Sequence, residues 1–84
     1  MFQDNKEEKV KKIYLEYHRL MGYVAYRILK NEQDAEDAVQ DAFITISNNI
    51  SKITEPVCEK TKYFALIIVK RKAIDILRKK RQQK

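Results

Sequence analysis

The sequence predicts an all-α fold, a compact bundle of three main helices with an irregular loop between the second and the third. Apolar residues recur at three- and four-residue spacing in three stretches of the chain, which is typical of helices buried on one face. One Gly and one Pro are too few for the tight turns of a β fold. With 84 residues and 44% hydrophobic residues, the chain is expected to form one small domain, residues 1–84.

The first predicted helix covers residues 1–30. Gly22 interrupts it at a cost of about 1 kcal/mol relative to Ala, unless Gly22 allows close helix packing. His18 has no Cys or His neighbour at metal-ligand spacing, so we interpret it as a surface or core-edge residue, and Tyr23 and Tyr26 as core-edge aromatics. The apolar stripe of this helix consists of Val10, Ile13, Tyr14, Tyr17, Leu20, Met21, Val24, Ile28 and Leu29.

The second predicted helix covers residues 31–50. Asn31 is a suitable N-cap, and the acidic residues of the first turn suit the positive end of the helix dipole. Its apolar face consists of Ala35, Ala38, Val39, Ala42, Phe43, Ile46 and Ile50. Its polar face consists of Glu32, Asp34, Glu36, Asp37, Gln40 and Asp41.

A loop over residues 51–61 and a third helix over residues 62–81 complete the predicted fold. Periodicity is lost in the loop, and Pro56 disfavours helical backbone at the residue before it. The apolar run from Phe64 to Val69 is also compatible with a strand. However, the helical spacing continues beyond it and no partner strand is available, so we expect a helix with Ile67 and Ile68 in the core.

Charge is segregated along the chain, although the net charge is only +6. Residues 1–30 hold seven Lys/Arg against four Asp/Glu, residues 31–59 hold one against seven, and residues 60–84 hold ten against one. Such segregation indicates two partners, one basic and one acidic. Solvated faces without a partner are the alternative.

The composition argues against an enzyme, a metalloprotein and a membrane protein. One His and one Gly leave no catalytic Ser–His–acid set and no glycine-rich phosphate loop. Asp34, Asp37 and Asp41 recur at helical spacing, but they lack the glycine turn of a calcium loop, so no metal and no cofactor is expected. We expect neither a secretory signal nor membrane insertion, and the single Cys58 favours a reducing, cytoplasmic setting.

The third helix and the end of the loop are the predicted nucleic-acid surface, because their basic side chains can contact phosphate oxygens. Tyr63 is the better candidate for stacking on an unpaired base, since it lies just outside the apolar run. Phe64 suits stacking and the core equally well. The basic residues are Lys60, Lys62, Lys70, Arg71, Lys72, Arg78, Lys79, Lys80 and Arg81.

The acidic second helix is the predicted protein surface, because DNA would be repelled by it. Asp37, Gln40, Asp41 and Ile44 lie along one edge of this helix and suit docking to a basic helical surface. Plain solubility is the alternative interpretation of these residues.

The segments DAEDAVQDAF and KRKAIDILRKKR, with an irregular loop between them, resemble the second conserved region of bacterial extracytoplasmic-function (ECF) sigma factors. The resemblance extends from about Lys12 to Arg81. It implies a promoter-recognition domain that acts in transcription initiation, with RNA polymerase and promoter DNA as partners and an anti-sigma factor as a further possible partner.

The resemblance also implies roles for individual residues. The second helix would dock on the clamp helices of the largest polymerase subunit through Asp37, Gln40, Asp41 and Ile44, with Ser47 beside them. The loop would capture a base flipped from the non-template strand of the minus-ten element. The third helix would hold and help to melt that element, and its residues on the DNA side would be Lys70, Arg71, Lys72 and Arg78.

The chain departs from the family pattern at two places. Arg71 stands where members often have Asn, and no Trp is present near Phe64. The family pattern also continues into a linker and a helix-turn-helix, so we expect the sequence to be either an excised domain or a reduced relative. A protein-interaction module bound by an anti-sigma regulator and a nonspecific basic DNA-binding domain are the alternative functions. A nonspecific DNA binder would be unaffected by charge reversal of the acidic residues.

Overall fold

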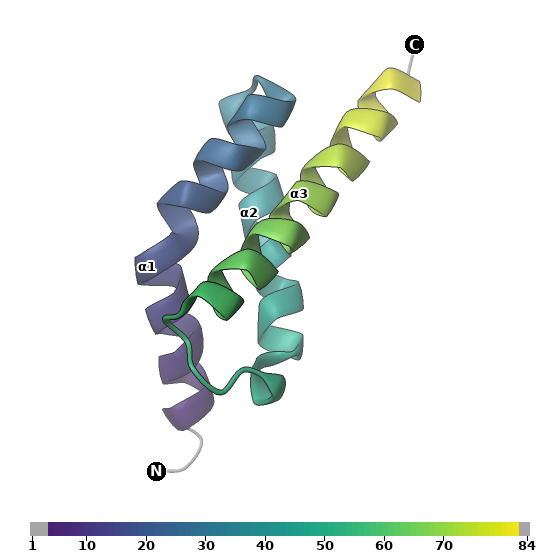
Figure 1. Cartoon of the computed structure of the whole chain (residues 1–84). Helices are drawn as coiled ribbons and strands as arrows, with labels where there is room; N and C mark the ends of the chain where they lie inside the picture. Colours follow the sequence, from purple (N-terminus) through teal and green to yellow (C-terminus); the bar gives the residue numbers. More distant parts are fainter. Residues whose placement is uncertain (1–3, 83–84) are drawn as a thin grey trace.

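The computed structural model describes residues 4–82 and contains three α-helices, α1 (Asp4–Leu29), α2 (Glu32–Asn48) and α3 (Glu59–Gln82), with a 3-10 turn η1 (Ile50–Lys52). No strand forms within residues 4–82, so the predicted all-α three-helix bundle is confirmed. Helices α1 and α2 run antiparallel, and α3 crosses them and packs against both (Figure 1). The bundle is elongated, with extents of 49 × 19 × 18 Å.

Two residues connect α1 to α2. Lys30 adopts a left-handed conformation with a φ of 57° and donates its backbone N–H to the carbonyl of Tyr26 at 2.7 Å, which ends α1. Asn31 then caps α2 as predicted, because its side-chain oxygen accepts the backbone N–H of Asp34 at 2.8 Å.

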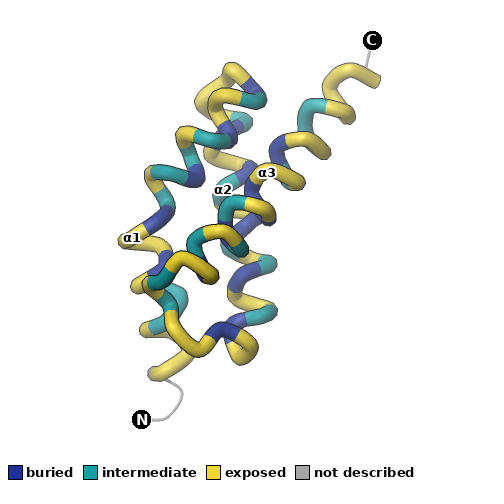
Figure 2. The backbone as a smooth tube through the Cα atoms, in the orientation of Figure 1, coloured by how far each residue is buried: buried dark blue, intermediate teal, exposed yellow. Residues whose placement is uncertain are grey.

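The core combines a few large side chains with many alanines. Ile13, Met21, Ile46 and Val69 are completely buried (Figure 2 shows the buried positions facing inward). Small side chains from all three helices allow the helices to pack closely. These are Ala25 of α1, Ala35, Ala38 and Ala42 of α2, and Ala65 and Ala73 of α3. The predicted apolar face of the second helix is buried or half-buried at every position.

The helix boundaries around the loop differ from the predicted ones. Helix α2 ends at Asn48 rather than at residue 50, because the side-chain amide of Asn49 donates to the carbonyl of Thr45 at 2.8 Å. Helix α3 begins at Glu59 rather than at residue 62. Its first turn is stabilised by the buried Thr61, whose hydroxyl donates to the Glu55 carbonyl at 2.5 Å. The predicted 51–61 loop is therefore reduced to an irregular segment between η1 and α3.

Two predicted core residues lie on the surface instead. Ile67 is 51% exposed, because α1 and α2 cover only one side of α3 and Ile67 lies on the other side. Ile68, the next residue, is buried as predicted. Tyr14 is also exposed, although its ring stacks on that of His18 at a centroid distance of 4.2 Å and tilts against Phe43 at 5.3 Å.

Gly22 does not allow a close helix contact, because a Cβ atom at this position would meet no heavy atom within 4 Å. We expect Gly22→Ala to raise the free energy of unfolding by about 1 kcal/mol, since Ala is the better residue within a helix. Urea denaturation measures the change. Gly22→Ser fills the same space with a poorer helix former and should give a smaller gain. A loss of stability in Gly22→Ala would contradict the interpretation.

Candidate protein and nucleic-acid interfaces

The acidic ridge is the exposed edge of α2, formed by Asp37, Gln40, Asp41, Ile44 and Ser47. All five side chains are exposed, and Ile44 is an unusually large apolar group for a solvent-facing position, at 60% exposure. The burial of Ala38, Ala42 and Ile46 on the opposite side of α2 fixes this orientation. The ridge thus offers two carboxylates and an apolar residue to a partner.

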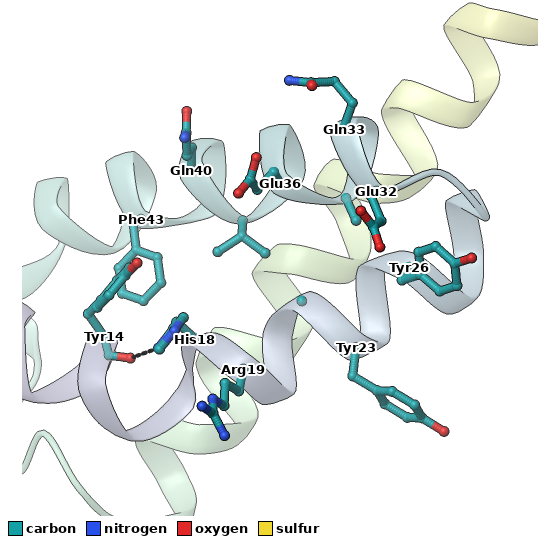
Figure 3. A pocket seen from close by; sticks show the side chains of 13 residues that line it. Tyr14, His18, Arg19, Tyr23, Tyr26, Glu32, Gln33, Glu36, Gln40 and Phe43 are labelled. Carbon is teal, nitrogen blue, oxygen red and sulfur yellow. Dashed lines mark hydrogen bonds between the residues drawn. The ribbon is translucent and has the colours of Figure 1, made fainter.

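An aromatic groove of about 800 Å³ lies beside the ridge, between α1 and α2. Figure 3 shows its α1 wall with Tyr14, His18, Tyr23 and Tyr26, and its α2 wall with Glu32, Glu36, Gln40 and Phe43. Gln40 belongs to both the ridge and the groove, so the two form one continuous surface. Tyr14 was predicted in the apolar stripe, and Tyr23 and Tyr26 at the core edge, but all three are exposed. They line a groove that forms only where α1 pairs with α2, which the sequence does not reveal.

The basic face is the solvent-exposed side of α3. Its predicted residues are exposed except Lys62 and Lys72, which are half-buried. Tyr63 is 55% exposed, and Lys62 places its Nζ 6.0 Å from the centre of the Tyr63 ring. The exposed Ile67 and Ile74 lie among the basic side chains, so the face offers apolar as well as cationic contacts. The last turn of α3, residues 78–82, is exposed around its circumference (Figure 2).

The loop hollow is a cavity of about 600 Å³ between the irregular segment and the first turns of α3. Ile53, Phe64 and Ile67 provide apolar lining, and Lys52 and Lys60 provide positive charge. Phe64 also packs against the core, which confirms the core role left open by the sequence, while stacking on a base stays a prediction. The remaining lining residues are Asn49, Thr54, Glu55, Cys58, Thr61 and Tyr63.

A family model described as Sigma-70 region 2 matches residues 13–83. The chain belongs to the sigma-70 region 2 family. Promoter recognition and binding to RNA polymerase are therefore its functions at the family level. The matched range includes the acidic ridge, the loop hollow and the basic face. Neither a curated protein nor a solved structure gives a significant match.

In this region 2 domain, two ion pairs join the acidic helix α2 to the basic helix α3. Lys72 places its Nζ 3.8 Å from a carboxylate oxygen of Asp41. Lys80 pairs with Asp34, whose side chain is only 14% exposed. The segregated charges thus serve partly to hold α3 on α2. Lys72 and Asp41 were predicted for different partners, and the structure brings them together.

Two titratable side chains near the loop hollow have shifted pKa values. The Thr61 hydroxyl, together with backbone N–H groups at the start of α3, lowers the pKa of the Cys58 thiol. Burial raises the pKa of the Tyr17 phenol, whose hydroxyl donates to the Cys58 carbonyl at 3.1 Å. At neutral pH Tyr17 therefore remains a hydrogen-bond donor.

Among residues 4–82, no group of three His, Cys, Asp or Glu side chains is placed to hold a metal ion. The three aspartates at helical spacing accordingly do not form such a group. No helix in this part of the chain is long and apolar enough to cross a membrane.

Proposed function

We propose that this domain is region 2 of an ECF-type bacterial sigma factor, which docks on the polymerase clamp helices and holds the melted minus-ten promoter element. The observation that carries the proposal is the arrangement of two surfaces. The acidic ridge lies on α2, whereas the basic face and the loop hollow lie on and beside α3. A protein partner and a nucleic acid can therefore bind at the same time.

The acidic ridge and the aromatic groove suit a basic helical partner. Asp37 and Asp41 supply charge complementarity, and Ile44 supplies an apolar contact between polar neighbours. The neighbouring groove can receive side chains from the same partner, since Gln40 lies on both surfaces. An anti-sigma regulator that covered these residues would compete with polymerase.

The loop hollow suits a base that has left the stack. Its apolar lining and the exposed Tyr63 can contact the faces of a base, while Lys60 can contact a phosphate of the same strand. A non-template strand seated there would continue along the basic face of α3. The domain would act by binding alone, without catalysis, in the cytoplasm where polymerase transcribes.

The basic face offers a substitute for the missing tryptophan. Ile67 and Ile74 are exposed between basic side chains, where they can cover bases that have lost a stacking partner. Arg71 replaces the Asn of related sequences and favours phosphate or guanine contacts. The promoter preference is therefore expected to differ from that of sigma factors with Asn at this position.

Replacing Arg71 and Arg78 together with Ala tests the assignment of α3. We expect binding of the polymerase-bound domain to forked DNA to fall about tenfold, and the salt slope to decrease in size by about 1.4 to 1.8. The double variant Lys11→Ala with Lys12→Ala removes the same charge from the exposed surface of α1 and is the control. An unchanged slope in the Arg71 and Arg78 variant would show that α3 does not contact the phosphates.

A further inference from the structure

Two side chains of α1 reach the backbone of the irregular segment that forms one wall of the loop hollow. Lys9 donates from Nζ to the carbonyl of Ile53 at 2.7 Å. Tyr17 donates from its hydroxyl to the carbonyl of Cys58 at 3.1 Å. These acceptors stand at the two ends of the segment, so α1 holds it at both ends.

The two donors lie about two helical turns apart on α1. Lys9 and Tyr17 are eight residues apart, so they lie on one side of α1 about 12 Å from each other along the helix axis. The Tyr17 ring is buried in the core and only its hydroxyl reaches the loop. Lys9 is half-buried, and its ammonium group forms a charge-assisted hydrogen bond.

A third hydrogen bond completes the attachment of the segment. The Thr61 hydroxyl donates to the Glu55 carbonyl at 2.5 Å. Ile53, Glu55 and Cys58 all line the loop hollow, and a side chain from a neighbouring helix holds the carbonyl of each. Backbone hydrogen bonds also hold the two ends, from the Ile53 N–H to the Ile50 carbonyl at 3.1 Å and from the Lys62 N–H to the Cys58 carbonyl at 2.9 Å. The wall of the hollow is therefore positioned by side chains together with the ends of η1 and α3.

We propose that Lys9 and Tyr17 are positioning residues for base capture, which hold the loop wall in the shape that admits an unpaired base. This inference rests on the function proposed for the loop hollow. Neither residue needs to touch the DNA. When these two hydrogen bonds are removed, the loop occupies the receptive shape for a smaller fraction of the time. The apparent affinity for the base falls in proportion to that fraction.

The experiment compares a short single-stranded DNA of random sequence with an abasic strand of the same length, each titrated against the full chain. The measured quantity is the ratio of the two affinities, which isolates base contacts from phosphate contacts. The variants are Lys9→Met, which keeps the aliphatic stem, and Tyr17→Phe, which keeps the buried ring. We expect each to lower the ratio about threefold and the double variant to lower it about tenfold.

Matched controls separate positioning from charge and from general stability. Lys11→Met removes the same charge from an exposed site on α1. It should keep the wild-type ratio. Lys9→Arg retains a cationic donor and should restore most of the ratio lost in Lys9→Met. A purely structural role would lower both affinities together and leave the ratio unchanged.

The outcomes distinguish this inference from the proposed function. If the wild-type chain binds both strands equally, the hollow does not capture a base, and both proposals are overturned. If the wild type prefers the base-bearing strand and the variants retain that preference, only the positioning role is overturned. If the double variant loses its helical circular dichroism, the ratios of Lys9→Met and Lys9→Arg are compared instead. A ratio that falls in Lys9→Met and recovers in Lys9→Arg supports the positioning role, and equal ratios overturn it.

Discussion

Asp41→Arg is expected to weaken binding of the domain to isolated polymerase clamp helices about a hundredfold, while the helical fold is retained. Asp41 is exposed in the acidic ridge next to Gln40 and Ile44, where a basic partner would approach it. Reversal replaces an attraction with a like-charge contact, which costs several kcal/mol at a docked interface. Titration calorimetry with wild type and variant measures the effect.

The ion pair between Asp41 and Lys72 requires a control of its own. Asp41→Arg also breaks this pair, but an exposed pair contributes only about 0 to 1 kcal/mol to stability. Lys72→Ala breaks the same pair without changing the ridge and should leave clamp binding intact. Glu7→Arg makes the same charge change at an exposed site on α1. Unchanged affinity in Asp41→Arg would refute the docking assignment.

Ile46→Ala is expected to lower the free energy of unfolding by about 3 kcal/mol. Ile46 is completely buried where α2 faces the other helices, so the truncation removes apolar contacts and leaves a cavity. The loss is a large share of the stability of a small domain, typically about 5 to 15 kcal/mol. Urea denaturation followed by circular dichroism provides the measurement.

Ile44 provides the matched control for Ile46, since it lies two residues away and faces solvent. Ile44→Ala should change stability by less than about 0.5 kcal/mol. It should nevertheless weaken clamp binding, because Ile44 belongs to the acidic ridge. Equal destabilisation by the two substitutions would contradict the orientation of α2.

The second helix could be predicted from the sequence because its signals are local. The three- and four-residue spacing from Ala35 to Ile46 identifies the buried face, and Asn31 marks the start. The opposite edge of the helix must then face solvent, so the exposure of the ridge residues could also be predicted. The start of α3 was missed because it depends on a contact between Thr61 and Glu55, which periodicity does not reveal.

The interfaces between helices were not predictable in the same way. The pairing of Asp41 with Lys72 and the aromatic groove depend on the rotation of each helix about its axis. The exposure of Ile67 has the same origin, because an apolar run does not show which of its sides lacks a partner. The loop hollow likewise requires the attachment of the irregular segment to α1.

The two-residue connection at Lys30 and Asn31 has a consequence for the order of folding. It joins α1 and α2 with very little chain to close, whereas α3 returns to α1 only after η1 and the irregular segment. Pairings between neighbouring segments form faster than those that close longer loops. We therefore expect the helical hairpin with the ridge and the groove to assemble first. During synthesis on the ribosome, the acidic ridge proposed to bind protein would therefore form first. The final helix, which carries the basic face proposed to bind DNA, would be made later.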